Sequence, residues 1–402
     1  MMEGPIISID VSNGNSHYIL FEKNNKKVGG VHKINHDVEG FARLKTDIKM
    51  LSEKVGEEVC VVYEATGVYT RPLQRFLEKN DIKQYIISPL ESARKRKEGI
   101  HSKKTDKLDP IAISKVYYDR QEMRLHEVED DRFHRMKQLN RLYEDKINHL
   151  RKYKVTFQNS LSICFPGFLD LFNDGYSGLA MVILKKYPHP DLIKKKQPET
   201  IARYIEKHTC HKKAVSMRYA IKIIDFANET YPGCDYGDIE VKILQDLLEK
   251  VEMARKDADE TLQKIIQIAE TINEYYLILS IDGIGPNLAS RILAEIGDIK
   301  RFKTREALIA YLGLDPNISQ SGQLDGDHLS ISKKGNKRLR CLLYLAVTCN
   351  IRLKNVNPIN QFYQKKRQQL NPLNSKAAKV ACTAKLAKII YGMCKNNTIF
   401  QR

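Results

Sequence analysis

The first 120 residues alternate strand-like and helix-like segments, and this order restricts the possible folds more than any other feature of the sequence. Three β-rich runs come first, separated by short polar turns, as in a meander. Helical periodicity then alternates with two further apolar strands. The expected strands span residues 5–12, 16–23, 26–34, 57–67 and 83–89, and the expected helices span 37–52, 70–80 and 105–120, the last with Thr105 as its N-cap. The sequence therefore predicts an α/β domain with a mixed sheet.

The middle of the chain is helical, with apolar residues at a four-three spacing. In residues 244–272 this spacing lasts about four heptads with Arg255 as its only break, which favours a coiled-coil arm. A long helix within a bundle fits the same spacing. Residues 143–161 follow the pattern too, interrupted at Lys154. Between these helices, residues 164–235 contain Pro and Gly breaks and predict a small helical insertion.

Positive charge is concentrated at the C-terminal end of the chain. The protein has 67 Lys and Arg against 49 Asp and Glu, and residues 330–402 contain sixteen of the basic residues and no acidic one. The remaining residues are close to electrical balance. A folded segment of one charge sign indicates a polyanionic partner, and nucleic acid is favoured over a membrane surface because no amphipathic anchor is evident.

Other features of composition favour a cytoplasmic protein without a membrane span. No apolar run approaches the roughly 20 residues that a span needs. The N-terminus has an acidic residue where a signal peptide has basic ones. The eight cysteines form no CxxC pair, so free thiols are expected and a structural zinc site is not.

Four acidic residues stand where catalytic carboxylates are found in α/β nucleases. Asp10 interrupts the apolar run of the first strand, Glu64 closes a second apolar strand, and Asp106 and Asp109 share one face of a helix. Each acid alone also fits a turn, cap or helix-dipole role. Together they suit Mg²⁺, or Mn²⁺, because hard cations prefer carboxylate oxygens and water. Two such ions about 4 Å apart can support phosphodiester cleavage.

The order of the elements, with acids at these places, resembles the RNase H-like fold in its RuvC-type DEDD version. Basic residues accompany the acids, as a groove that follows phosphates requires: the run 93–97, then Lys103, Lys104 and Lys107.

Two further motifs lie in the C-terminal part. Residues 279–297 resemble a helix-hairpin-helix, in which Gly283 and Gly285 let backbone N–H groups approach a phosphate, although a glycine turn between packed helices fits as well. Downstream, a polar loop contains Ser319 and Ser321. A loop serine followed by cations is a candidate nucleophile towards phosphorus, although loop serines are common turn residues. The cations that would stabilise charge on the phosphoryl oxygens are Lys333, Lys334, Lys337, Arg338 and Arg340.

Two sets of motifs together resemble one family across nearly the whole chain. The N-terminal set is IDVS, YEATG and KTDKLDP, and the C-terminal set is GIGPNLASRILAEIGDIKRF, YLGLDP, SG and ISKKGNKRLR. It is the DEDD-type insertion-sequence transposases of the IS-one-ten group, serine recombinases guided by a bridge RNA. The resemblance implies that Asp10, Glu64, Asp106 and Asp109 bind Mg²⁺ and that Ser321, with Ser319 as the alternative register, is the nucleophile.

The resemblance also implies partners and an assembly. They are DNA at the element ends and target, a structured bridge RNA, and further copies of the chain in a tetramer arranged as a dimer of dimers. In that tetramer the acids of one protomer and the serine of another form a composite site. Cleavage would leave a covalent phosphoserine and a free 3′-hydroxyl. The loop departs from the family pattern at Asp325 and Asp327, where a more basic run is usual.

The expected organisation is a RuvC-like domain over 1–122, a helical coiled-coil region with its insertion over 123–275, and a mainly helical serine transposase domain over 276–402 that binds DNA and RNA. The expected location is the prokaryotic cytoplasm, on the nucleoid. Two other functions stay open. A junction-resolving nuclease would use the same acids with water as nucleophile, and a non-catalytic nucleic-acid scaffold would need none of them.

Overall fold

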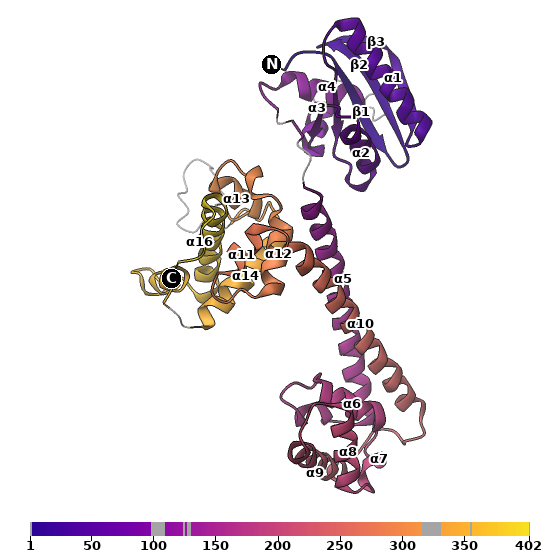
Figure 1. Ribbon diagram of the computed structural model, residues 1–402, viewed down its shortest axis with the longest axis vertical. Coiled ribbons are helices and arrows are strands. Elements are labelled where there is room, and N and C mark those ends of the chain that lie inside the picture. Colours follow the sequence, from indigo (N-terminus) through magenta and orange to yellow (C-terminus); the bar gives the residue numbers. More distant parts are fainter. Residues whose placement is uncertain are drawn as a thin grey trace. The chain divides into compact units, whose positions relative to one another are not determined.

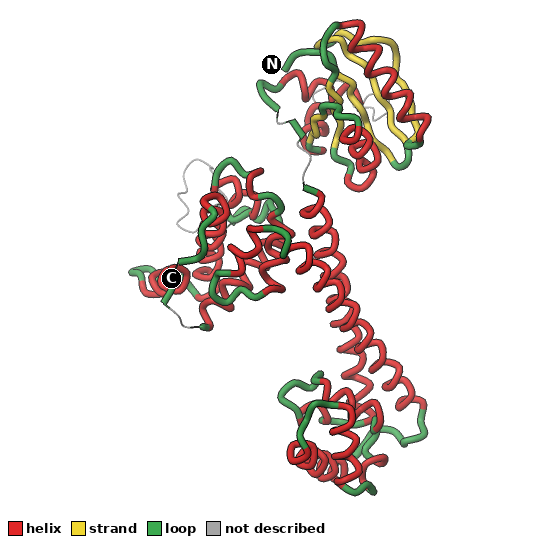
Figure 2. Tube along the Cα trace, in the orientation of Figure 1, coloured by secondary structure: helices red, strands yellow, loops and turns green. Residues whose placement is uncertain are grey.

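The computed structural model describes residues 2–97, 109–123, 125–126, 130–315, 331–353 and 356–401. The chain divides into two units, residues 1–128 and 129–402, which are coloured along the sequence in Figure 1. Within the described residues the strands belong to the first unit and the second unit is helical, as Figure 2 shows. This confirms the predicted mixed α/β region followed by a mostly helical one.

The first unit contains a five-stranded mixed sheet with the order β3-β2-β1-β4-β5. The first three strands are antiparallel neighbours, whereas β4 and β5 run parallel to β1. The strands are β1 (Ile6–Ser12), β2 (Asn15–Lys23), β3 (Lys26–Asn35), β4 (Cys60–Glu64) and β5 (Gln84–Ile87). All five expected strands are present, with ends that differ by a few residues.

Two tight turns fix the register of the antiparallel strands. Ser12 pairs with Asn15 across Asn13 and Gly14, and Gly14 has the positive φ of 74° that such a turn requires. The β2–β3 turn is also two residues long, with Asn25 at φ 60°. Asparagine and glycine tolerate this conformation, so the local sequence specifies both hairpins.

Helices cover both faces of the sheet. Apolar residues of α1 and α2 pack on the face formed by the odd-numbered residues of β1, and α4 packs on the even-numbered face. Asp37 caps α1 by accepting a hydrogen bond from Gly40 N at 2.7 Å, and Gly56 ends it in a left-handed conformation. The helices are α1 (Val38–Val55), η1 (Gly67–Thr70), α2 (Arg71–Lys79), α3 (Pro89–Lys97) and α4 (Asp109–Asp119).

The helix α3 was not among the helices expected from the sequence. The basic run 93–97 lies within α3. The expected start of the last helix, Thr105, lies outside the described residues, which take up the helix again at Asp109.

In the second unit, two long antiparallel helices form an arm: α5 (Asp131–Cys164) and α10 (Ile239–Ala269). Buried apolar residues recur along both helices at the expected heptad spacing, among them Tyr143 and Phe157 on α5 and Leu244 and Ile265 on α10. Their packing therefore forms one continuous two-helix seam.

The ends of this arm belong to different hydrophobic cores. One core joins the early part of α5 and the late part of α10 to the C-terminal helices, and the other joins their opposite ends to the helical insertion. The insertion consists of η2 (Phe168–Leu171), α6 (Gly178–Lys186), α7 (Asp191–Lys194), α8 (Pro198–His208) and α9 (Lys213–Glu229). The C-terminal helices are α11 (Asn273–Leu279), α12 (Pro286–Ile296), η3 (Ile299–Arg301), α13 (Arg305–Leu312), α14 (Lys337–Arg352), α15 (Pro358–Gln368) and α16 (Ser375–Asn396).

Across the described ranges, no helix has the length and apolar character needed to cross a membrane. All eight cysteines are free thiols.

Candidate carboxylate site and serine-loop neck

Asp10 and Glu64 lie on neighbouring parallel strands. The pairing of β1 with β4 ends at Ile9 and Tyr63, and the two acids are the next residues on their strands. Because side chains alternate along a strand, both acids lie on the face that α4 covers. Both are buried, with 9% of Asp10 and 7% of Glu64 exposed.

The start of α4 brings a third acid to this region. Ser8, two residues before Asp10 and on the same face of β1, donates a hydrogen bond to the carbonyl of Pro110 at 2.5 Å. That bond fixes the first turn of α4 against β1. Asp109, the preceding residue, is 6% exposed. Three of the four predicted carboxylates are therefore buried, two on neighbouring strands and one at the start of the helix that packs on them.

Two neighbours of these acids were not predicted. Ser92 of α3 is fully buried and donates a hydrogen bond to Glu64 Oε2. His17 lies opposite Asp10 in the antiparallel pair of β1 and β2, and its Nδ1 is buried without a hydrogen-bond partner in the described part of the chain. Neither residue stands in a recognisable motif, so only the strand register and the helix position reveal them.

The donor set has the chemistry of a site for a hard divalent cation. Buried carboxylates are costly unless they are paired, hydrogen-bonded or bound to a cation, and oxygen ligands are those that Mg²⁺ and Mn²⁺ prefer. Among the described residues, no group of three His, Cys, Asp or Glu side chains is placed to hold a metal ion. The fourth acid, Asp106, lies outside the described residues, as do Lys103 and Lys104.

The predicted helix-hairpin-helix is a turn between α11 and α12. Gly283 has φ 83°, and a Cβ there would lie 2.8 Å from the backbone N of Asn350 on α14. Its missing side chain thus permits close packing of the turn on α14. Gly285 is the N-cap of α12, and a Cβ there would meet nothing within 4 Å. Phosphate binding at this turn stays a prediction.

Both predicted nucleophile positions, Ser321 and Ser319, lie outside the described residues. The backbone on either side of residues 316–330 forms a closed neck, defined here as residues 311–315 and 331–336. Within the neck, Lys333 N donates to Gly313 O at 3.1 Å and Asn336 N donates to Tyr311 O at 2.7 Å. A Cβ on Gly335 would lie 2.5 Å from Gly313 N, so the two chain segments touch through glycine.

A buried acid anchors this neck to the arm. Glu295 of α12 is 2% exposed, and each of its carboxylate oxygens accepts a 2.8 Å hydrogen bond, Oε1 from Asn140 Nδ2 of α5 and Oε2 from Asn336 Nδ2. The Oδ1 of Asn336 accepts from Leu339 N and thereby caps α14. The GN sequence before a helix is a cap signal, but nothing in the sequence indicates its link to Glu295.

The five predicted cations lie in the neck and at the start of α14. Arg338 Nε donates to Glu144 Oε2 at 2.6 Å, and this hydrogen bond raises the pKa of the arginine above its usual value. Arg340 donates to the carbonyl of Leu312 at 2.5 Å. Lys333, Lys334 and Lys337 are exposed. Two of the five cations therefore form side-chain hydrogen bonds within the fold, although Arg338 stays exposed, and the three lysines face solvent.

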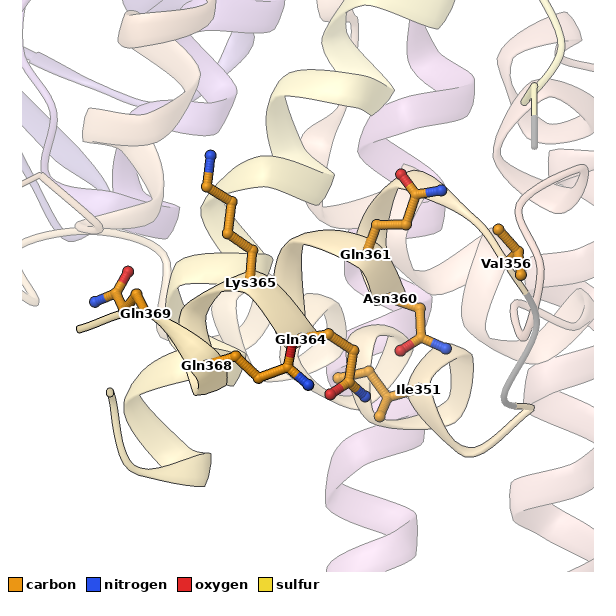
Figure 3. Close-up of a pocket in the computed structure, with 8 residues that line it drawn as sticks. All are labelled: Ile351, Val356, Asn360, Gln361, Gln364, Lys365, Gln368 and Gln369. Atoms are coloured by element: carbon orange, nitrogen blue, oxygen red, sulfur yellow. The ribbon is translucent and has the colours of Figure 1, made fainter. Parts of the chain in front are cut away.

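A cleft of about 960 Å³ lies along α15, and no sequence motif indicated it. Figure 3 shows that amide side chains and one lysine of α15 line it, beside two apolar residues. The lining residues are Ile351, Val356, Asn360, Gln361, Gln364, Lys365, Gln368 and Gln369. Neutral amides can donate and accept hydrogen bonds, but they supply neither a nucleophile nor a metal-binding charge.

A mixed α/β domain with buried carboxylates, followed by a mostly helical region, fits the class of DEDD transposases. The family model for DEDD-type transposases matches residues 7–166, and the model described as "Transposase IS116/IS110/IS902 family" matches residues 275–364. The chain belongs to the IS110 family of DEDD-type transposases, the group that its motifs indicated.

Named relatives agree with this assignment. The protein "Putative transposase y4rJ" of Sinorhizobium fredii is 33% identical over 27% of this chain and 28% of its own length. "Probable family 20 transposase" of Pseudomonas aeruginosa is 32% identical over 31% of this chain and 36% of its own. "Mini-circle putative transposase for IS117" of Streptomyces coelicolor is 24% identical over 72% of this chain and 71% of its own. The chain thus spans about a third of the first two relatives.

Proposed function

We propose that this protein is a DNA transposase and recombinase of an insertion sequence. The observation that carries the proposal is the burial of three acids in a region matched by the DEDD transposase model: Asp10 and Glu64 on the sheet face that α4 covers, and Asp109 at the start of α4. A protein that only binds a polyanion gains nothing from acids gathered beside its binding surface.

The N-terminal region is assigned the RNase H-like, RuvC-like fold over residues 1–122. The order β3-β2-β1-β4-β5, with three antiparallel strands and two parallel ones, supports this assignment. A coiled-coil region over 123–275 and a serine transposase domain over 276–402 complete the proposed organisation.

The carboxylates Asp10, Glu64, Asp106 and Asp109 are assigned to a divalent metal site for Mg²⁺, with Mn²⁺ as a substitute. When bound, such an ion polarises phosphoryl oxygens as a Lewis acid. The chain's own contribution is to hold the carboxylates in a buried position, and Ser92 orients Glu64 through its hydrogen bond.

Ser321 is assigned as the nucleophile. Its Oγ would form a bond to phosphorus and transfer its proton to a base while the P–O3′ bond breaks, and the departing 3′ oxygen would leave protonated as a hydroxyl. In the exchange step, a 3′-hydroxyl from the partner strand would attack the same phosphorus and release the serine. The cations at the start of α14 would stabilise the negative charge on the phosphoryl oxygens.

The proposed partners are DNA at the element ends and target, a structured bridge RNA and further copies of this chain in a tetramer, working on the nucleoid in the cytoplasm. The acid-free segment 330–402 supports a nucleic-acid partner, and family membership supports the guide RNA and the assembly.

A strand-exchange reaction on DNA that carries the element ends, with the flanking non-coding RNA supplied, tests the nucleophile. Ser321→Ala should abolish both the exchange and the covalent protein–DNA adduct on SDS gels, whereas Ser319→Ala, the matched control, should retain them. If the Ser321→Ala protein still forms the adduct, the serine assignment is wrong. Cleavage by the wild type without any adduct would favour the junction-resolving nuclease.

The same reaction tests the carboxylates. Asp10→Asn removes one negative charge from the metal site at nearly constant volume, so metal-dependent cleavage should be lost while DNA binding is retained. Cleavage at the wild-type rate, or cleavage by the wild type in EDTA, would contradict the metal site.

A further inference from the structure

The arm helix α5 and the start of α14 enclose a second cleft, of about 800 Å³, in the helical unit. Five cations line it. Lys334, Lys337 and Arg338 come from the neck and α14, and Lys137 and Arg141 come from α5. The two α5 cations are four residues apart, so they lie on the same face of that helix.

The carboxylates of the cleft are already engaged by other groups. Glu144 bridges two guanidinium groups, with Oε2 at 2.6 Å from Arg338 Nε and Oε1 at 3.4 Å from Arg291 Nη2. Glu295 is buried, and both of its oxygens accept hydrogen bonds from amides. Both acids are held in the walls of the cleft, and its five cations outnumber them.

Four of the five cations make no ion pair with any residue that the structure describes: Lys137, Arg141, Lys334 and Lys337. Arg141, Lys334 and Lys337 are exposed, and Lys137 is half-buried. Like charges that face one cleft repel each other unless an anion lies between them, and a polyanion that binds there also gains free energy because it releases its own condensed counterions. Glu144 and Glu295 keep the walls in place, because they tie α5 to α12, α14 and the neck.

We infer that this cleft binds the phosphodiester backbone of a nucleic acid, with α5 as one wall and the neck with α14 as the other. The inference rests on the proposed function only in requiring that the protein bind nucleic acid. It adds a role for the arm, because Lys137 and Arg141 then contact the substrate directly. The cations lie on two separate elements, which suits a chain of phosphates better than a single small anion.

The test compares charge-matched double variants of the full-length protein. Lys137→Gln with Arg141→Gln removes the α5 cations of the cleft, and Arg135→Gln with Lys152→Gln removes two exposed cations of the same helix that do not line it. Binding is measured by fluorescence anisotropy at a series of KCl concentrations. One set of measurements uses an element-end DNA duplex, and a second set uses an RNA hairpin from the flanking region.

The cleft variant should bind at least about tenfold more weakly than wild type, and its plot of log affinity against log salt should be shallower by about 2, close to one unit for each lost phosphate contact. The control variant should keep the wild-type slope. Lys137→Arg with Arg141→Lys should restore it, since charge alone is required. Thermal unfolding of all variants shows that the fold is kept.

The nucleic acid whose slope changes, DNA or RNA, identifies the backbone that occupies the cleft. A change with either of them supports the inference. If the cleft variant and the control behave alike with both nucleic acids while the wild type binds, the inference is wrong and the proposed function stands. If the wild type binds neither nucleic acid, both fail.

Discussion

At the scale of single residues, the carboxylate region shows which side chains a sequence pattern can and cannot reveal. Asp10 and Glu64 could be singled out because an acid within an apolar strand costs free energy unless it is paired, hydrogen-bonded or bound to a cation. Ser92 could not be predicted, because a serine in a basic helix has no distinguishing neighbours. Its significance comes from the packing of α3, which brings its Oγ to Glu64 Oε2.

Ser92 supports a prediction about metal affinity. Ser92→Ala removes the hydrogen bond that orients Glu64, so the Mg²⁺ concentration for half-maximal DNA cleavage should rise roughly tenfold or more. The matched control is Ser114→Ala, because Ser114 is also buried but, among the residues that the structure describes, bonds only to the carbonyl of Ile111 in its own helix. A metal titration of cleavage by both proteins decides the matter, and identical midpoints would contradict a role for Ser92.

At the scale of elements, the local sequence predicted where helices and strands lie, but it did not predict which of them contact each other. The Asn13-Gly14 turn and the heptads of α10 are local signals, and the elements they predicted are present. The meaning of Gly283 was not local: φ 83° fits the predicted turn, but the reason that no Cβ is tolerated is the backbone of α14, some 65 residues away.

Asn336 allows the connection between elements to be tested. Asn336→Ala removes the cap of α14, at about 1 kcal/mol, and leaves one oxygen of the buried Glu295 without its donor, at about 1–3 kcal/mol more. Asn374→Ala is the matched control, since Asn374 caps α16 through Ala377 N and lacks a second bond of this kind among those described.

Urea unfolding measures both free energies. The Asn336→Ala protein should lose clearly more stability than the Asn374→Ala protein, and Asn336→Asp should also lose more, because it keeps the cap but sets a second carboxylate beside Glu295. Equal losses for Asn336→Ala and Asn374→Ala would show that the neck does not depend on Glu295.

At the scale of the whole molecule, each unit possesses its own apolar cores, two on the faces of the sheet and two along the arm. The sequence predicted an α/β domain followed by helical regions, but periodicity cannot say which helices share a core. That the two halves of the arm belong to different cores follows only from the way the C-terminal helices fold back on α5.

Independent cores predict independent folding. Residues 1–128 and residues 130–402, produced separately, should each be soluble and unfold cooperatively in circular dichroism experiments, because neither set of apolar clusters needs the other. The full chain should show the sum of the two transitions. A unit that is insoluble or unfolds without cooperativity on its own, although the full chain is well behaved, would refute this expectation.

The length of the antiparallel pair α5 and α10 sets a fixed distance inside the helical unit. At 1.5 Å per residue, the 31 residues of α10 extend about 46 Å, and a core closes each end of the pair. The separation between the insertion and the C-terminal helices is therefore set by residue number rather than by a loop. Adding one heptad to both helices would move the insertion outward by roughly 10 Å while the seam kept its register. Evolution can thus adjust the reach of this unit in discrete increments, without redesigning what lies at either end.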